Sequence, residues 1–386
     1  MNYLMVDISG RSPIYDIALC NALHKAMSPK HHIKLFAANI QPTEIECDWG
    51  KMFNFIPPKL QRSKATPLRA IKAIMAVLNY LALIVRMTMQ KTDILHFQWL
   101  PFVEISSIEK YFLIILHRIL PNTKFILTIH NVYPHDSNSI KKQSYRKRFA
   151  QVESFFDKFI VHLETTKKEF CSDFKISTDR VKVINHGILT PKNINAIRRH
   201  REKKTNLIMF GNQSCYKGTD IFVQAIALLP QECQKNVHAL IVGKTYPSYL
   251  NELKRTNENI EIIPEYVSDE ELYKHIISSD IIILPYREIS QSGVLLLALS
   301  FKRLIITSDI PSFKETLAYL GEDTFFENGN AESLSKLIGK YVNRLVDEDK
   351  QLNAIERLKE KYSWENVAKM YEDFLISKTE QSHPQI

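Results

Sequence analysis

The chain has 386 residues, of which 45% are hydrophobic, and this composition excludes wholesale disorder. At roughly 100–200 residues per domain, the length predicts two or three domains. The five cysteines are scattered without a CxxC pair, which argues against structural zinc and favours a reducing, cytoplasmic compartment. The opening MNYLMVDISG lacks the basic region and long apolar run of a secretory signal and instead predicts a buried strand.

The net charge of +9 is unevenly distributed. Residues 1–188 contain 26 Lys and Arg against 15 Asp and Glu, whereas residues 189–386 contain 25 against 27. A basic first half indicates an anionic partner, namely a membrane surface, a lipid diphosphate or a nucleic acid, although a solvated basic surface would look the same. No helix-turn-helix, RNA-recognition or zinc signature supports the nucleic acid.

In the first half, short apolar runs alternate with amphipathic stretches, as in βα units. The expected strands are Tyr3–Ile8, Ile33–Ala37, Ile94–Gln98, Phe125–His130, Phe159–His162 and Val181–Asn185. Helices are expected between them, including Ile14–Met27 and Phe149–Phe156. The apolar segment Pro67–Met89 fits a buried domain helix, an interfacial membrane helix or a membrane span.

A polar, basic segment over 189–205 reads as a linker to a second series of βα units. The expected strands of that series are Leu207–Gly211, Ala239–Gly243, Ile260–Pro264, Ile281–Pro285 and Leu304–Thr307. The last stretch, 362–378, has an apolar helical face that needs a surface to pack on. We therefore predict an N-terminal domain over 1–188, a C-terminal domain over 206–361 and a closing helix.

Two loops in the second half follow strands and open helices, where backbone amides can bind anions. In the first loop a strand ends at Gly211, Asn212 follows, and Lys217 precedes a helix, so an ammonium joins the amides. The glycine spacing of Walker and dinucleotide fingerprints is absent. The second loop contains Arg287 and Glu288, which could bind sugar hydroxyls or lie in solvent, and then Ser292 and Gly293 at a helix start.

Aromatic and polar residues follow strands in the first half. Trp99, Tyr133 and His135 could stack on acceptor sugar rings or simply cap a core. The basic run of Lys141, Lys142, Arg146, Lys147 and Arg148 could face lipid headgroups, an acceptor diphosphate or solvent.

Over about 206–315 the chain resembles the retaining family-4 glycosyltransferases (glycosyl transferases group 1), as a divergent variant. The resemblance is carried by the Gly-x-x-x-x-x-Lys-Gly loop, Ile-Val-Gly-Lys at 241–244, Glu-Tyr-Val-Ser-Asp-Glu-Glu-Leu at 265–272, Leu-Pro-Tyr at 284–286 and Ile-Thr-Ser-Asp at 306–309. The first half is similar more weakly, through Gly10, His130-Asn131 and His186-Gly187. The closing helix resembles the one that crosses back onto the N-terminal domain in this fold.

The resemblance implies an α/β GT-B fold, with two Rossmann-like doubly wound parallel-sheet domains facing a central cleft. It implies catalytic roles for His130, Lys217 and Glu288. The implied donor-binding residues are Gly10, Gly187, Gly211, Asn212, Lys217, Val267, Arg287, Ser292 and Gly293, and the acceptor-side residues are Trp99, Asn131, Tyr133 and His135. The family commonly has an arginine at Asn212 and a ribose-binding glutamate at Leu297, so this chain departs from it twice.

The expected activity is transfer of a hexose from a nucleotide-diphosphate sugar to a saccharide or lipid-linked acceptor, in surface polysaccharide synthesis. Retention is implied by the resemblance. An inverting enzyme would need a base, for which Asp7, His135 and Asp136 are candidates. Because no DxD-type carboxylate pair appears at the end of an expected strand, we expect no metal and no cofactor. The protein is expected in the cytoplasm, with peripheral contact at the inner face of the plasma membrane. A nucleotide-sugar epimerase and an inactive sugar-nucleotide-binding protein are the alternatives.

Overall fold

The computed structural model describes residues 1–40, 42–56, 66–134, 138–191, 204–245 and 260–376. The chain divides into two compact units, one formed by Met1–Gly187 with Ser363–Ile386 and the other by Ile188–Tyr362. We call them unit 1 and unit 2. Most of the predicted linker, 192–203, lies outside the described residues, as does 246–259.

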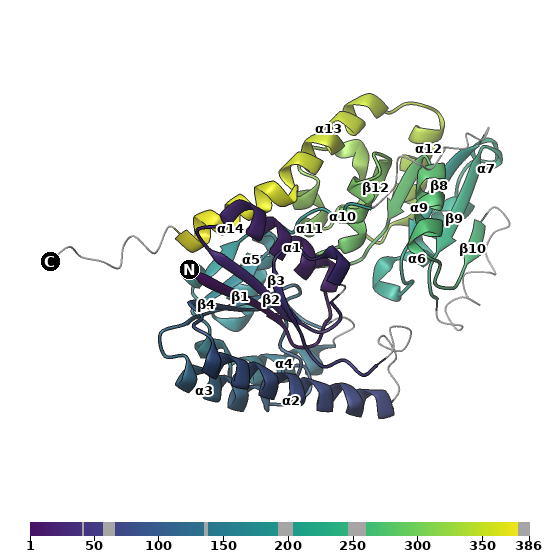
Figure 1. Cartoon of the computed structure of the whole chain (residues 1–386). Helices are drawn as coiled ribbons and strands as arrows, with labels where there is room; N and C mark the ends of the chain where they lie inside the picture. Colours follow the sequence, from purple (N-terminus) through teal and green to yellow (C-terminus); the bar gives the residue numbers. More distant parts are fainter. Residues whose placement is uncertain (41, 57–65, 135–137, 192–203, 246–259, 377–386) are drawn as a thin grey trace. The chain divides into compact units, whose positions relative to one another are not determined.

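Unit 1 is built on a seven-stranded parallel sheet in the order β3-β2-β1-β4-β5-β6-β7 (Figure 1). Its strands are β1 (Asn2–Asp7), β2 (His32–Ala37), β3 (Asp48–Lys51), β4 (Ile94–Phe97), β5 (Lys124–Thr128), β6 (Lys158–Val161) and β7 (Val181–Val183). Its helices are α1 (Pro13–Met27), α2 (Thr66–Met89), α3 (Glu109–Ile119), α4 (Ser139–Phe149), α5 (Glu164–Phe174) and α14 (Trp364–Ile376), with short 3-10 turns at Pro42–Glu44, Glu153–Phe155 and Thr178–Arg180.

Alternate residues of β1 face opposite layers of unit 1, as the period of a strand requires. Tyr3 and Met5 pack with α1 and α14, whereas Leu4 and Val6 pack with α2 and α3. Helix α14 belongs to unit 1 although it follows unit 2 in sequence, and the Tyr15 and Tyr371 hydroxyls lie 3.3 Å apart across the α1–α14 contact.

Unit 2 is built on a six-stranded parallel sheet in the order β10-β9-β8-β11-β12-β13. Its strands are β8 (Thr205–Phe210), β9 (Val237–Val242), β10 (Ile260–Ile263), β11 (Ile281–Leu284), β12 (Leu304–Ser308) and β13 (Phe325–Phe326). Its helices are α6 (Thr219–Ala227), α7 (Gln231–Lys235), α9 (Asp269–Ser278), α10 (Gly293–Leu299), α11 (Pro311–Thr316), α12 (Ala331–Val342) and α13 (Glu348–Lys361), with 3-10 turns at Cys215–Lys217 and Glu322–Thr324.

The predicted pair of doubly wound parallel sheets is confirmed. In each sheet the strand order reverses beside the first strand, at β1/β4 and at β8/β11, and ligands of such sheets bind outside the carboxyl ends of the strands there. One predicted helix is wrong: Phe149–Phe156 is not a helix, because α4 ends at Phe149 and a turn follows. Strands β3 and β13 were not predicted.

Candidate functional site

In unit 2 the loop after β8 places a lysine ammonium in a buried position. Lys217 ends a 3-10 turn and is 5% exposed, and its Nζ lies 5.3 Å from the centre of the Tyr286 ring. Among the described residues no hydrogen bond or ion pair reaches this Nζ. Burial lowers the pKa of Lys217 to about 8. A buried cation without a counter-ion is costly unless a ligand supplies the opposite charge.

Backbone approaches in this loop require glycine. Gly218 has φ +69°, and a Cβ there would lie 1.9 Å from the Pro285 carbonyl oxygen. A Cβ on Gly211 would lie 2.8 Å from the Lys217 Nζ. The loop therefore brings Pro285, which follows β11, against the start of α6 and leaves the ammonium beside the end of β8.

Arg287 holds the turn that carries Lys217. Its guanidinium donates two hydrogen bonds to the Asp220 carboxylate, at 2.9 and 2.6 Å, and one at 2.7 Å to the Cys215 carbonyl oxygen. Its backbone N–H donates to the Tyr216 carbonyl. The predicted contact of Arg287 with sugar hydroxyls is untested, and the structure shows the side chain engaged within unit 2.

The sequence did not point to Gln213, which is 1% exposed. Its amide donates to the Gly211 carbonyl at 2.6 Å and accepts from the Thr219 hydroxyl at 2.7 Å. It thereby ties the strand end to the helix start around Lys217. Its neighbour Asn212 is exposed.

The second predicted loop of unit 2 also opens a helix. Ser292 caps α10 by accepting a hydrogen bond from the Leu295 N–H at 3.1 Å, and Gly293 is exposed. Glu288 is exposed in the same loop. Val267 and Leu297 are half-buried against the apolar cluster of unit 2. Leu297, which stands where the family has its second glutamate, therefore packs against the core in this chain.

Unit 1 contains a cavity of about 720 Å³ at the carboxyl ends of β1, β4 and β5. It brings together five predicted residues, namely Gly10, Trp99, His130, Asn131 and Tyr133. Arg11, Lys72, Gln98, Glu104 and Tyr145 also line it and were not predicted. His135 lies outside the described residues, and so does Asp136. Gly187 instead packs under the C-terminal helix, since a Cβ there would lie 2.4 Å from the Trp364 ring.

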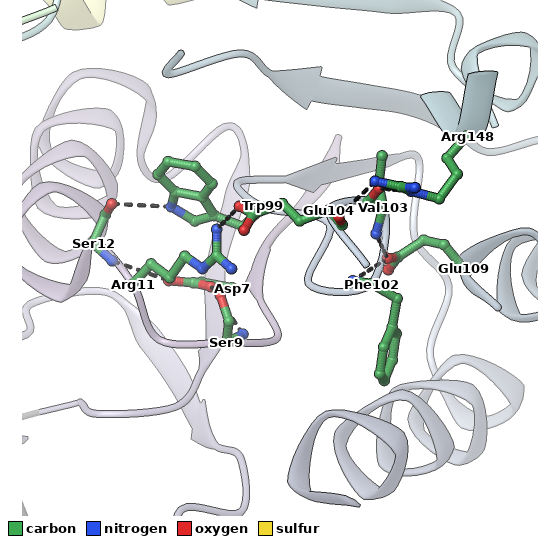
Figure 2. Close-up of polar contacts among 10 residues, drawn as sticks. All are labelled: Asp7, Ser9, Arg11, Ser12, Trp99, Phe102, Val103, Glu104, Glu109 and Arg148. Carbon is green, nitrogen blue, oxygen red and sulfur yellow. Dashed lines mark hydrogen bonds and ion pairs between the residues drawn. The ribbon is translucent and has the colours of Figure 1, made fainter. Parts of the chain in front are cut away.

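The glycine loop after β1 is built on Asp7. This fully buried carboxylate accepts hydrogen bonds from the backbone N–H groups of Ser9, Gly10 and Ser12 at 3.0, 2.9 and 3.3 Å, and from the Ser9 hydroxyl (Figure 2). Asp7 does not line the cavity, so the structure gives it a positioning role in place of a base. Figure 2 also shows Arg11 of this loop paired with Glu104.

Trp99 forms one wall of the cavity. Its ring stacks on His130 with centroids 4.7 Å apart and an interplanar angle of 17°, and its Nε1–H donates to the Ser12 hydroxyl at 3.0 Å. The Arg11 guanidinium lies 5.3 Å from the ring centre. Tyr133 donates to the Asp173 carboxylate, so its hydroxyl is already engaged. A stacked aromatic surface beside polar groups suits a sugar ring.

His130 is a neutral imidazole at neutral pH. Burial lowers its pKa well below the usual value, and the nearby histidines at 162, 186 and 96 lower it further. His162 Nδ1 lies 3.0 Å from the Ile184 carbonyl oxygen and donates a hydrogen bond to it. His162 Nε2 is therefore unprotonated and accepts a hydrogen bond from His130 Nδ1–H, 3.3 Å away. His130 Nε2 then keeps its lone pair, and the Gln98 amide, whose Oε1 is placed 3.1 Å away, donates to it once its oxygen and nitrogen are exchanged.

Glu109 stabilises the loop that follows β4 and contains Trp99, Phe102 and Val103. Its buried carboxylate accepts from the N–H groups of Phe102 and Val103 at 2.6 and 3.1 Å and from the Tyr80 hydroxyl. Burial raises the pKa of Glu109 to about 7, against the lowering effect of those hydrogen bonds. Arg148 completes the support by donating to the carbonyls of Val103 and Glu104 (Figure 2).

No group of three or more His, Cys, Asp or Glu among the described residues is arranged to hold a metal ion. The buried charge of Lys217 and the polar cavity around His130 lie in different units. Together they offer an anion site and a sugar-sized polar cavity, each at the carboxyl end of a parallel sheet.

Comparison with known proteins agrees with this architecture. Residues 204–344 match the family described as glycosyl transferases group 1. No curated protein matches the sequence. Among solved structures, Anabaena Alr3699/HepE in complex with UDP and glucose has a TM-score of 0.68 at 13% identity, covering 98% of this chain and 100% of that one. A glycosyltransferase from Rickettsia africae ESF-5 has a TM-score of 0.67 at 18% identity, covering 99% of both chains.

The lipopolysaccharide outer core galactosyltransferase WaaB is similar with a TM-score of 0.61 at 13% identity, covering 98% of this chain and 100% of that one. At such low identity these structures establish the fold. The family match covers residues 204–344, and the predicted resemblance is confirmed. The chain therefore has the GT-B fold, is divergent from its structural relatives, and matches glycosyl transferases group 1 over residues 204–344, which together support a glycosyltransferase (EC 2.4).

Proposed function

We propose that this enzyme transfers a hexose from a nucleoside diphosphate sugar to a saccharide or lipid-linked acceptor. The observation that carries the proposal is the buried ammonium of Lys217, which lies beside Gly211. This ammonium has no counter-ion among the described residues of unit 2. A diphosphate would supply the missing charge. The HepE structures contain UDP and UDP-glucose, so uracil is the first base to test.

Sugar transfer requires stabilisation of the departing diphosphate while the anomeric carbon becomes cationic. Lys217 and the backbone amides at the start of α6 would provide that stabilisation without reorganisation. The amides at the start of α10, near Ser292, would add to it. These groups support a metal-independent reaction.

We propose retention of anomeric configuration. Retaining transfer needs no strong protein base, and the one inverting-base candidate within the described residues, Asp7, is enclosed by its own loop. His130, neutral and stacked on Trp99, would lie against the transferred sugar and act through hydrogen bonds rather than as an acid. Proton NMR of the first product formed would report the anomer, and an inverted product would contradict this part of the proposal.

The acceptor would occupy the cavity of unit 1. Trp99 offers a stacking surface, and Lys72 adds positive charge to a wall in which Arg11 and Glu104 form an ion pair. Such a lining suits a sugar that carries or adjoins an anionic group. Synthesis of a surface polysaccharide in the cytoplasm is the process that we propose for it, and the WaaB galactosyltransferase supplies a structural parallel.

The proposal is tested by calorimetric titration of UDP, GDP, ADP and CMP and of their sugars, with a chelator present. Specific binding of one nucleoside diphosphate, lost in Lys217→Ala, is the expected result. Binding that needs added metal would contradict the metal-independent step. Conversion of the sugar nucleotide without an acceptor would identify an epimerase, and tight binding without any turnover would identify an inactive binding protein.

A further inference from the structure

Helix α2 has an inner face that is fixed on the sheet of unit 1. Tyr80, Leu83 and Met87 are buried in the apolar core. Asn79, 1% exposed, donates to the Ile8 carbonyl at 3.0 Å and accepts from the Phe53 N–H at 2.7 Å. This helix is long and apolar enough to cross a membrane, but a span would break these contacts.

The outer face of α2 is an exposed apolar stripe. Six large side chains recur at helical spacing with exposed fractions between 36% and 73%, namely Ile71, Ile74, Leu78, Leu81, Val85 and Met89. Soluble proteins rarely expose contiguous apolar patches of this kind without a partner.

The neighbouring helix continues the patch. Helix α3 packs beside α2, with the Tyr80 and Phe112 rings stacked at 4.4 Å. Ile108, Tyr111 and Ile115 recur at helical spacing on α3 and its first turn, and they are 39%, 58% and 41% exposed. We call the nine side chains of the two helices the outer apolar face.

The exposed charges carried by α2, α3 and α4 have one sign. The only carboxylate in α2, α3 and α4, all of whose residues lie in the described part of the chain, is Glu109, and it is buried. The cations of these helices are Arg69, Lys72 and Arg86 on α2, Lys110 and Arg118 on α3, and Lys141, Lys142, Arg146, Lys147 and Arg148 on α4. All three helices contribute to the apolar layer on one face of the sheet (Figure 1).

We propose that the outer apolar face docks into the interfacial region of an anionic lipid bilayer, with α2 lying parallel to its surface. Apolar side chains would enter the headgroup–acyl boundary and the surrounding cations would meet lipid phosphates. A second copy of the chain is disfavoured as the partner, because a two-fold contact would bring two cationic rims together.

Docking would also place the cavity of unit 1 close to headgroups, because Lys72 of α2 lines it. The closeness of the cavity to headgroups matters for function only if the cavity is the acceptor site, as proposed above. The docking proposal is independent of the proposed function, because the outer apolar face lies in unit 1 and Lys217 lies in unit 2.

The test is co-sedimentation of the full chain with vesicles of phosphatidylcholine alone and with about one third phosphatidylglycerol. The wild type is expected to bind the anionic vesicles, and added salt is expected to release it. Ile74→Glu combined with Leu81→Glu should lower the partition coefficient at least about tenfold. Lys141→Gln and Lys147→Gln should each lower it about fivefold, which corresponds to about 1 kcal/mol per surface cation.

The matched control is Leu228→Glu combined with Leu345→Glu, which alters exposed leucines of unit 2 and should leave partition unchanged. Ile74→Ala with Leu81→Ala should give a smaller loss, and unchanged unfolding midpoints would show that every variant folds. Equal partition of wild type and the α2 glutamate variant would overturn the proposal. Self-association of the wild type without vesicle binding, if that variant abolishes it, would also overturn the proposal. Vesicle binding that neither salt nor alkali can reverse would overturn it as well.

Discussion

The ammonium of Lys217 lies 5.3 Å from the centre of the Tyr286 ring. It is buried, and no counter-ion lies beside it among the described residues of unit 2. The ring face offers a weak attraction that does not replace a carboxylate. Such a site is stabilised by an arriving anion rather than by the protein itself.

Removal of this charge should therefore change activity and stability in opposite directions. Lys217→Met keeps the stem volume but removes the buried ammonium. We expect kcat/KM to fall at least about 100-fold and the ligand-free protein to gain roughly 1–3 kcal/mol. Steady-state kinetics and urea unfolding would measure the two effects. A variant that is both inactive and destabilised would show that Lys217 is primarily structural.

The pH dependence of binding should follow the same group. With a folded pKa of about 8 against an ordinary 10.5, the unfolded chain binds more protons than the folded one between these values. Ligand-free stability should therefore rise as pH rises from about 8 to 10.5. Nucleoside diphosphate affinity should fall over the same range, up to about tenfold per pH unit. Calorimetric titration at several pH values would show it, and Lys217→Met should have a flat profile.

Glu109 should make unit 1 sensitive to pH below neutrality. Its folded pKa of about 7 lies above the ordinary 4.5, so its contribution to stability is full below about 4.5 and is lost as pH rises through about 7. Glu109→Gln can accept from Phe102 and Val103 with its oxygen and donate to Tyr80 with its amide. We expect this variant to lose that part of the pH dependence in thermal unfolding. An unchanged profile would place the titration elsewhere.

Gly218 offers a test of the close approach that shapes the Lys217 turn. Gly218→Ala should destabilise unit 2 by at least about 3 kcal/mol, because a left-handed backbone is combined with a Cβ 1.9 Å from the Pro285 oxygen. The control is Gly329→Ala, where φ is +80° but nothing lies within 4 Å of the added Cβ, and about 1 kcal/mol is expected. Equal losses in urea unfolding would mean that only backbone strain matters.

The Arg287–Asp220 pair separates two roles for the arginine. If Arg287 acts by holding the turn, Arg287→Ala and Asp220→Ala should each weaken UDP binding about tenfold, and the double variant should lose little more. Titration of UDP and UDP-glucose with all three variants would measure this. A loss confined to the sugar nucleotide would instead support the predicted contact with sugar hydroxyls.

Local pattern predicted the two sheets because buried strands such as β8 and β11 are continuous apolar runs that end at loop residues. It did not predict β3, an edge strand in which Asp48, Trp49 and Lys51 are exposed and no apolar alternation remains. The aromatic spacing after Phe149 resembled a helix because those rings pack inward from a turn.

The candidate sites divide in the same way. Gly10, His130 and Lys217 lie in loops that follow strands. The βα pattern predicted Lys217 as part of an anion site, whereas the family resemblance implied the roles of Gly10 and His130. Lys72 reaches the unit 1 cavity from the second turn of the crossover helix α2, and the partner of Arg287 lies 67 positions earlier in the chain. Contacts over such separations depend on tertiary packing, which a single sequence does not display.

The placement of α14 has a consequence for synthesis on the ribosome. This helix covers α1 in unit 1, yet it is made only after all of unit 2. Tyr15 and the apolar side of α1 stay uncovered until Tyr371 leaves the ribosomal tunnel. Unit 2, which ends at Tyr362, leaves the tunnel before Tyr371 does. Unit 2 can complete its fold first, and the last helix then closes the first domain, so a nascent chain truncated at Tyr362 would carry an exposed hydrophobic surface that attracts chaperones.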